Sequence, residues 1–162
     1  NDFIYTFHTT VSQKDTVKKF LLDSGLSNFE IISDDKIKKF LLKKSIFAIA
    51  KSGTVSLEIC LEKIPSIIIY KINFINYLIL KLLVKVKYAN ILNIASNKMI
   101  IPELLQSNCN AENIYKNVNF FIENPNEIKK QLKNIELTLD TFMTKNLPSD
   151  EVSNYLKKLI SF

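Results

Sequence analysis

The residues best suited to chemistry lie in one short stretch from Ser52 to Glu58, which reads Ser-Gly-Thr-Val-Ser-Leu-Glu. Gly53 permits a tight backbone turn, and the hydroxyl residues around it are typical of a helix start. Free N–H groups at a helix start can bind phosphate, and Glu58, one turn later, is placed to accept hydrogen bonds from a ribose diol. The simpler interpretation is that Ser52 or Thr54 caps the helix and Glu58 favours its dipole, and this stretch taken alone favours that interpretation.

Three further polar residues are candidates for the same site. Lys71 follows the apolar run Ser66–Tyr70, and a lysine at the end of a strand can act as a point charge for a diphosphate, although many lysines are simply solvated. Asn93 offers both a donor and an acceptor to a sugar or a base. Glu103 is expected at a helix N-terminus, where its simpler role is to interact with the helix dipole.

The sequence predicts no metal site and no cofactor. His8 is the single histidine, and Cys60 and Cys109 lie in neither a CxxC nor a cysteine–histidine pattern. No acidic DxD pair is present to hold a divalent ion. We interpret His8, at the end of the first predicted strand, as a structural residue outside the site.

The composition describes a folded domain with an unusual bias. The chain has 162 residues, of which 47% are hydrophobic and 23% charged, so wholesale disorder is excluded. The formal net charge is +6, but every basic residue is a lysine and these lysines are scattered among apolar residues. Specific DNA recognition relies on arginine forks, so the charge is weak support for nucleic-acid binding.

Alternating strands and helices are expected to position the candidate residues. Strands are predicted at 3–7, 29–32, 46–50 and 66–70, and helices at 15–24, 34–44 and 54–62. This order predicts an α/β fold, a Rossmann-like parallel sheet with helices on both faces, in which ligands bind at the carboxyl ends of the strands. The rest of the chain reads as helical, at 101–106, 111–123, 125–145 and 150–161.

A strongly apolar helix is predicted over Asn73–Val86. It is too short to span a bilayer, which needs about 20 apolar residues. It is either buried against the sheet or an apolar surface that meets lipid, with lysines facing anionic headgroups. The candidate residues for membrane or acyl-chain contact are Phe74, Tyr77, Leu78, Lys81 and Lys85.

Four blocks of the sequence, in order and in register, resemble the lipid-A-disaccharide synthases, which are glycosyltransferases of the GT-B fold. The blocks are 50–58 (AKSGTVSLE), Pro65 with 67–72 (IIIYKI), 82–88 (LLVKVKY), and 102–106 (PELLQ) followed by Cys109. The resemblance implies a donor-binding C-terminal half, with residues 1–124 as the nucleotide-sugar-binding domain. Residues 125–162 would then be a helical extension that packs on this domain or on an N-terminal domain.

The resemblance also implies an activity. The family transfers diacylglucosamine from UDP-diacylglucosamine to diacylglucosamine 1-phosphate in lipid A biosynthesis, as a metal-independent, cytoplasmic enzyme peripheral to the inner face of the cytoplasmic membrane. Ser52, Gly53, Thr54 and Lys71 would then stabilise the departing UDP, and Glu58 and Asn93 would hold the nucleoside, with Glu103 close by. This chain has no candidate catalytic residue, and it reads as a segment that starts inside a domain, so we expect it to be inactive alone.

Some positions depart from the family pattern, and two other interpretations stay open. Leu92 replaces a proline, and Asn97, Lys98 and Met99 replace residues that the family usually has in this loop. The chain could be a non-catalytic remnant or a split-gene half that docks to a separate acceptor domain. It could also belong to another GT-B transferase with a different UDP-sugar.

Overall fold

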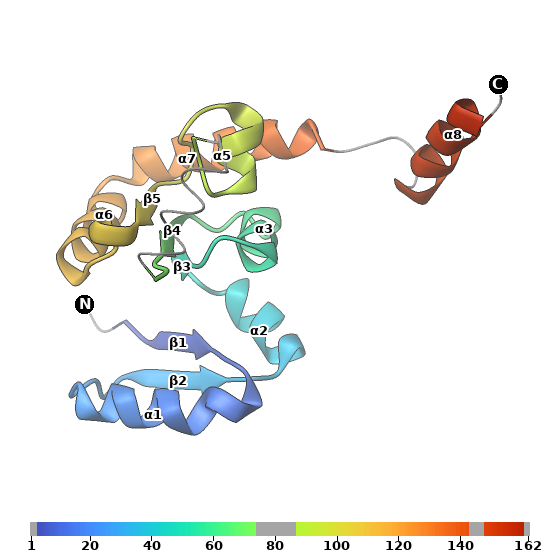
Figure 1. The fold of residues 1–162 in the computed structure, drawn as a ribbon. Helices are drawn as coiled ribbons and strands as arrows, with labels where there is room; N and C mark the ends of the chain where they lie inside the picture. Colours follow the sequence, from blue (N-terminus) through green and yellow to red (C-terminus); the bar gives the residue numbers. More distant parts are fainter. Residues whose placement is uncertain (1–2, 74–86, 143–147, 161–162) are drawn as a thin grey trace. The chain divides into compact units, whose positions relative to one another are not determined.

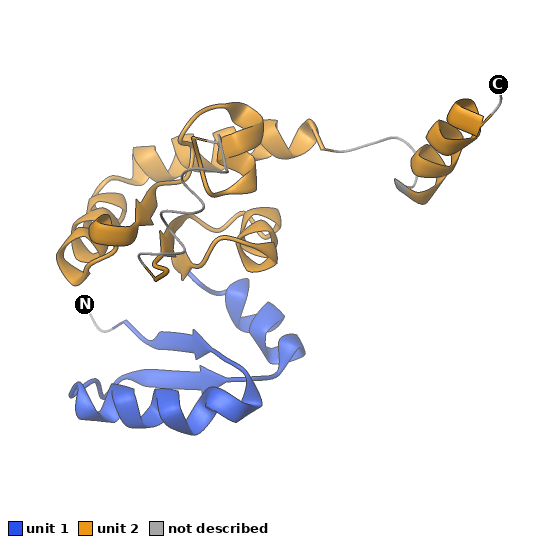
Figure 2. Cartoon of the chain, in the orientation of Figure 1, with its two compact units in different colours: residues 1–46 blue, residues 47–162 orange. Residues whose placement is uncertain are grey.

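A computed structural model describes residues 3–73, 87–142 and 148–160 of the chain (Figure 1). Contacts divide the chain into two compact units, Asn1–Ile46 and Phe47–Phe162 (Figure 2). Within both units the described strands pair in parallel and helices connect them, which confirms the predicted α/β class. The division into a donor domain, residues 1–124, and an extension, residues 125–162, stays a prediction.

The first unit is a β-α-β motif followed by a helix. Its elements are β1 (Tyr5–His8), the 3-10 turn η1 (Val11–Gln13), α1 (Lys14–Asp23), β2 (Phe29–Ile32) and α2 (Asp35–Leu42). The two strands are in register from Tyr5 opposite Phe29 onward. Asp34 caps α2, because its carboxylate accepts hydrogen bonds from the N–H groups of Lys36 and Ile37 at 2.8 and 2.9 Å.

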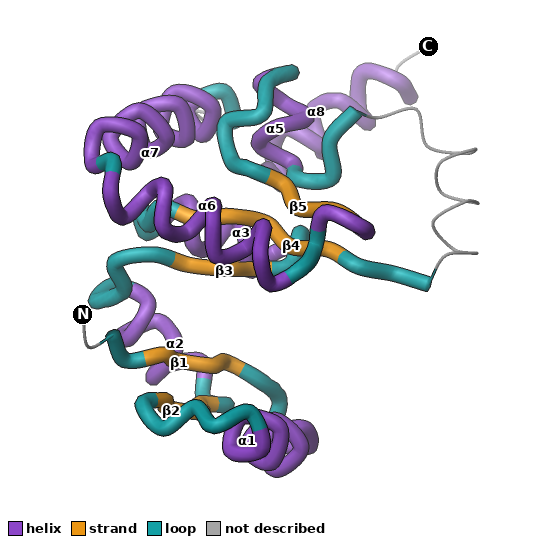
Figure 3. Tube along the Cα trace, turned by 90° about the vertical axis from the view of Figure 1, so that its left-hand side faces the viewer, coloured by secondary structure: helices purple, strands orange, loops and turns teal. Residues whose placement is uncertain are grey.

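The second unit contains a three-stranded sheet and most of the helices. Its elements are β3 (Ala48–Ala50), α3 (Thr54–Leu61), β4 (Ser66–Tyr70), α5 (Ile91–Ser96), β5 (Glu103–Leu105), the 3-10 turn η2 (Gln106–Asn108), α6 (Ala111–Glu123), α7 (Pro125–Asp140) and α8 (Pro148–Ile160). The strand order is β3-β4-β5, with β4 in the centre (Figure 3). Ala50, Ile68 and Glu103 lie in one row across this sheet.

The core of the second unit lies on both faces of β4. Ile67 packs with Leu104 and with Phe121 of α6, and further side chains of α6 and α7 close around them. Ile68 points to the opposite face, because side chains alternate along a strand, and it is fully buried. The strand is thus enclosed on both sides, as its unbroken apolar sequence indicates.

A glutamine of α7 holds the amino end of β4. The Nε2 of Gln131 donates to the carbonyl oxygen of Ser66 at 3.0 Å, and the N–H of Ser66 donates to the Oε1 of Gln131 at 2.9 Å. Gln131 is 3% exposed. Its primary amide therefore satisfies both backbone groups of a buried residue, as a neighbouring strand would.

The helix predicted over 101–106 is wrong, because Glu103–Leu105 form strand β5 and only residues 106–108 make a short 3-10 turn. The carbonyl oxygen of Pro102 accepts a hydrogen bond from the N–H of Ile68 at 2.8 Å, which extends the pairing with β4. Proline at the start of an apolar run is typical of a helix, but the free edge of β4 outweighs that local preference.

The apolar helix predicted over 73–86 falls, from residue 74 on, outside the described residues. Among the helices that the structure describes, none is long and apolar enough to cross a membrane.

Candidate functional site

The stretch that opens α3 has the backbone that its sequence predicts. Gly53 is the N-cap residue, and its backbone lies at φ 142°, ψ −160°, a conformation that residues with a Cβ rarely adopt. No side chain caps this helix through a hydrogen bond. The helix start follows the carboxyl end of β3. The N–H of Ser56 donates to the carbonyl oxygen of Gly53 at 3.1 Å, so the N–H groups of Thr54 and Val55 are the candidates for binding an external acceptor.

Neither Ser52 nor Thr54, the two predicted cap residues, caps this helix. The Oγ of Ser52 donates to the carbonyl oxygen of Ala89 at 2.7 Å, and Thr54 is exposed on the first turn. Ser56, which the sequence analysis did not single out, is buried and donates to the carbonyl oxygen of Gly53 at 2.7 Å. Glu58 lies half-buried on the next turn of the same helix.

Asn90 connects the start of α3 with the start of α5. Its Nδ2 donates to the Oγ of Ser56 at 3.0 Å, and its Oδ1 accepts the N–H of Leu92 at 2.9 Å, which caps α5. Asn90 is fully buried. The sequence gives one signal for this role, since asparagine directly before an apolar helix is a preferred N-cap.

Glu103 and Asn93 lie behind this turn, in the interior. The carboxylate of Glu103 accepts the N–H of Ala89 at 2.8 Å, the N–H of Asn90 at 2.9 Å and the Nδ2 of Asn93 at 2.7 Å. Asn93 also donates to the carbonyl oxygen of Ile101, and its Oδ1 accepts the N–H groups of residues 100 and 101. Glu103 stands on a strand rather than at the helix start predicted for it, which corrects that expectation.

Lys71 is exposed directly after the carboxyl end of β4. The start of α3 follows the carboxyl end of the neighbouring strand β3. The next residue, Ile72, is held by Gln106, whose Nε2 donates to the carbonyl oxygen of Ile72 at 3.1 Å and whose Oε1 accepts its N–H at 2.8 Å. Lys51, at the end of β3, places its Nζ 5.0 Å from the ring centroid of Tyr70. The ends of β3 and β4 therefore each carry a lysine, and the sequence analysis named only one.

The predicted site residues thus fall into two groups. Ser52, Gly53, Thr54 and Glu58 belong to the start of α3, and Lys71 to the end of the neighbouring strand, where ligands bind in parallel α/β sheets. Asn93 is 0% exposed and Glu103 9% exposed, and both are engaged with backbone groups. The residues predicted to contact membrane or acyl chains, namely Phe74, Tyr77, Leu78, Lys81 and Lys85, lie outside the described residues.

The loop that departs from the family pattern has a regular structure. Leu92 is fully buried on α5. Asn97 ends α5 in the left-handed conformation, at φ 50°, which asparagine tolerates better than most residues. Lys98 and Met99 are exposed. The substitutions at these positions are therefore compatible with the turn that they form.

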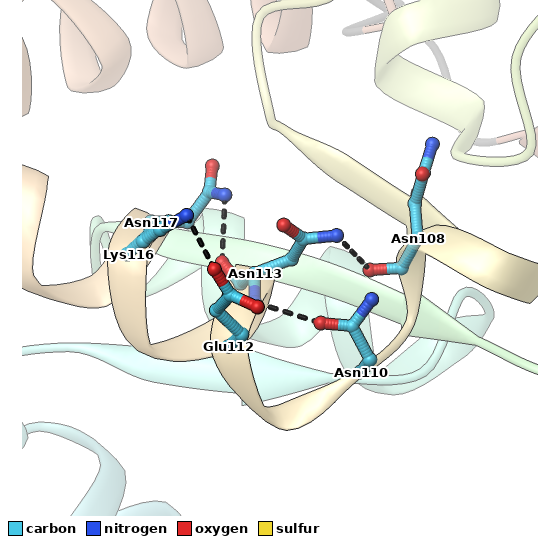
Figure 4. Close-up of polar contacts among 6 residues, drawn as sticks. All are labelled: Asn108, Asn110, Glu112, Asn113, Lys116 and Asn117. Atoms are coloured by element: carbon cyan, nitrogen blue, oxygen red, sulfur yellow. Dashed lines mark hydrogen bonds and ion pairs between the residues drawn. The ribbon is translucent and has the colours of Figure 1, made fainter.

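A second polar cluster lies at the start of α6 (Figure 4). The Oδ1 of Asn110 accepts the N–H of Asn113 and caps the helix, and the Nδ2 of Asn113 donates to the carbonyl oxygen of Asn108. Lys116 and Glu112 form an ion pair of 2.6 Å one turn apart. These residues form hydrogen bonds and an ion pair with one another at the helix start, so we assign the cluster a structural role.

Three further observations concern other places where chemistry could occur. A cavity of about 230 Å³ lies between α6, α7 and residues 99–102, close to the Gln131 that holds the amino end of β4. Within the described ranges, no three histidine, cysteine or acidic side chains gather in a way that could hold a metal ion. His8 lies 3.7 Å from the carboxylate of Asp35, which also pairs with Lys38 at 3.1 Å.

Comparison with known proteins identifies relatives for most of the chain. Residues 5–153 match the sequence model of the lipid-A-disaccharide synthetase family. A lipid-A-disaccharide synthase of Rickettsia bellii is 40% identical over 102 residues, which are 63% of this chain and 26% of the relative. A lipid-A-disaccharide synthase of Sulfurihydrogenibium is 34% identical over 135 residues, which are 80% of this chain and 34% of the relative.

A more distant relative extends the comparison. Lipid-A-disaccharide synthase 1 of Legionella pneumophila is 31% identical over 142 residues, which are 74% of this chain and 37% of the relative. The chain therefore spans between about a quarter and two fifths of the length of these curated relatives. Because the family model covers nearly the whole chain, including the start of α3 and strand β5, the chain belongs to the lipid-A-disaccharide synthetase family of glycosyltransferases.

Proposed function

We propose that this chain forms the UDP-sugar-binding part of a lipid-A-disaccharide synthase. The proposed reaction transfers diacylglucosamine from UDP-diacylglucosamine to diacylglucosamine 1-phosphate and releases UDP. The observation that carries the proposal is the start of α3, where Gly53 turns the chain and no side chain caps the helix. A diphosphate at this point would accept hydrogen bonds from the first-turn N–H groups and meet the positive end of the helix dipole.

We expect the predicted site residues to contact different parts of the donor. Ser52, Gly53 and Thr54 would contact the diphosphate, and the Nζ of Lys71, exposed after β4, would supply a positive charge. Glu58, four residues beyond Thr54 on the same helix, would accept hydrogen bonds from the ribose. Asn93 and Glu103 would support the site from the interior, since their polar atoms already bind the backbone.

Charge develops on UDP as the bond between the sugar and the diphosphate breaks. N–H groups that are fixed before the reaction stabilise such charge at little reorganisation cost, and Lys71 adds a Coulombic contribution. No residue of this chain is assigned to deprotonate the acceptor hydroxyl. We propose that an acceptor-binding domain supplies that base and that this chain is inactive without it.

The lipid substrates suggest where the protein works. Their acyl chains reside in a bilayer, so we propose that the enzyme acts as a peripheral protein at the cytoplasmic face of the inner membrane. The formal net charge of +6, with lysine as the source of positive charge, favours binding to an anionic lipid surface. The predicted apolar segment that contains Phe74 and Tyr77 is the proposed contact with lipid.

The decisive experiment is calorimetric titration of the chain with UDP. We expect measurable binding by the unaltered chain and its loss, by about tenfold or more, in Glu58→Ala, because the ribose loses its acceptor. Glu112→Ala is the matched control, since it removes an exposed carboxylate that pairs with Lys116 on the next turn of α6. Its UDP affinity should equal that of the unaltered chain.

Three outcomes would contradict the proposal in whole or in part. A folded chain that does not bind UDP would favour a non-catalytic remnant, or a half-site that needs its partner domain. Equal affinity of Glu58→Ala and the unaltered chain would remove Glu58 from the site. Tighter binding of a different nucleoside diphosphate would instead favour another GT-B transferase.

A further inference from the structure

The turn Ala89–Asn90, directly before α5, is held by hydrogen bonds from two elements, strand β5 and the start of α3. On one side its two N–H groups donate to Glu103, one to each carboxylate oxygen. On the other side the carbonyl oxygen of Ala89 accepts the hydroxyl of Ser52, and the side chain of Asn90 donates to Ser56. The turn therefore lies between strand β5 and the start of α3.

Glu103 is the fixed end of this arrangement. It stands in the sheet row that contains Ala50 and Ile68, and its side chain is 9% exposed. Its carboxylate accepts two backbone N–H groups and the Nδ2 of Asn93, and hydrogen bonds to a charged acceptor are among the stronger ones in proteins. A carboxylate with these partners has a fixed position relative to the sheet.

The start of α3 is the other end. Ser56 accepts from Asn90 and donates to the carbonyl oxygen of Gly53, while Ser52 contacts Ala89 directly. A continuous path of hydrogen bonds thus leads from the sheet, through the turn, to both sides of Gly53. This path adds to the covalent connection of α3 with β3, which consists only of residues 51–53.

We propose that Glu103 is a positioning residue of the UDP-sugar site, a role that rests on the function proposed above. Its carboxylate does not contact the donor. It holds the turn Ala89–Asn90, and through that turn it holds the first-turn N–H groups of α3 in the orientation that binds a diphosphate. Binding sites lose affinity when such preorganisation is lost, even if every contacting residue remains.

The test is Glu103→Gln in the same UDP titration. The glutamine keeps the size of the side chain but replaces one accepting oxygen with an NH₂ group, which opposes the N–H of Ala89 or Asn90. We expect UDP affinity to fall by about tenfold, with the far-ultraviolet circular dichroism unchanged. The amide proton shifts of residues 89 and 90 should move upfield, because their hydrogen bonds to a charged acceptor are lost.

Gln131→Ala separates a positioning role from general destabilisation. Gln131 makes two hydrogen bonds to Ser66 at the amino end of β4, away from the start of α3. We expect this variant to lose stability but to keep the UDP affinity of the unaltered chain. If it lost UDP affinity in the same proportion as Glu103→Gln, the effect of Glu103 would be general and the proposal would be wrong.

Ser56→Ala keeps the proposal testable if Glu103→Gln does not fold. It removes the hydroxyl that joins Asn90 to Gly53 and leaves all bonds of Glu103 in place, so UDP affinity should again fall. Wild-type affinity in a folded Ser56→Ala, or in a folded Glu103→Gln, would overturn the positioning role. Failure of the unaltered chain to bind UDP would instead contradict the proposed function itself.

Discussion

Gly53 shows how one residue can set the geometry of a site. Its φ of 142° is a conformation that an L-residue with a Cβ rarely adopts, whereas the space where a Cβ would stand is open to 4 Å. A substitution there is therefore opposed by the backbone and not by a clash with neighbours. The stretch Ser52–Glu58 needs glycine at this position in order to turn from strand to helix.

We predict that Gly53→Ala lowers the free energy of unfolding by about 1–3 kcal/mol, the usual cost of a strained backbone conformation. Urea denaturation measures the change. Gly25→Ala is the matched control, because Gly25 also has open space and a positive φ, of 77°, but lies in the first unit. Both variants should be destabilised, and only Gly53→Ala should bind UDP more weakly. Equal UDP binding by both would argue against a role of this turn in the site.

The two cysteines should differ sharply in reactivity. Burial raises the pKa of the Cys60 thiol to about 12, and its side chain has no exposed surface, whereas Cys109 is half-buried. Only the thiolate attacks a disulfide reagent, so at pH 8 Cys60 has neither the charge nor the access. We predict that a chromogenic disulfide reagent titrates one thiol in the folded chain and two after denaturation. Two rapid thiols in the folded chain would contradict the placement of Cys60.

At the scale of elements, α3 ends in a conformation that its sequence does not favour. Lys63 has φ 55°, while the N–H groups of Lys63 and Ile64 donate to the carbonyl oxygens of Cys60 and Ile59, as in a Schellman motif. Glycine is the usual residue there, because the left-handed conformation costs other residues about 1–2 kcal/mol. The side chain of Lys63 forms an ion pair of 2.7 Å with Glu136 of α7, which raises the pKa of Lys63.

We predict that Lys63→Gly is more stable than Lys63→Ala by about 1 kcal/mol. Both variants lose the exposed ion pair with Glu136, so their difference isolates the backbone conformation. Thermal unfolding followed by circular dichroism measures it. If the alanine variant were as stable as the glycine variant, the left-handed conformation at this position would not be the source of the strain.

The helices and strands differ in how far the sequence predicts them. The sequence predicts β4, and it predicts α6 with the same bounds, because unbroken apolar runs and helical spacing are local signals. Strand β5 is missed because three residues after a proline carry no such signal, and only the free edge of β4 selects the strand. The start of α3 is predicted for the same local reason, whereas the contacts of Asn93 and Glu103 depend on a turn that the sequence does not reveal.

At the scale of the whole molecule, α8 has an apolar face that no other described part of the chain covers. Its exposed apolar residues recur at helical spacing, namely Val152, Tyr155, Leu156, Leu159 and Ile160. Apolar surface on this scale promotes association between chains in water. We propose that this helix docks on a further domain, and we expect the chain by itself to self-associate.

We predict that the double variant Leu156→Glu with Leu159→Glu shifts the chain toward the monomer in sedimentation velocity experiments. The two charges would have to be desolvated in any contact through this face. The matched control is Ser153→Glu with Asn154→Glu, which adds the same charge to the same helix outside its apolar stripe. If both double variants changed the sedimentation coefficient equally, net charge and not the apolar face would govern association.

Two glutamine side chains from other elements bind the backbone near the two ends of β4, and this arrangement has a consequence for how the sheet assembles. Gln131 binds both backbone groups of Ser66, and Gln106 binds both backbone groups of Ile72, six residues later. A parallel strand that slipped by two residues would keep each side chain on the same face of the sheet, so hydrophobic burial alone would not reject the error. The slipped strand would, however, lose the hydrogen bonds to Gln131 and to Gln106 together. The two glutamines therefore specify the register of β4, because only one alignment of the strand allows both of them to form their backbone hydrogen bonds.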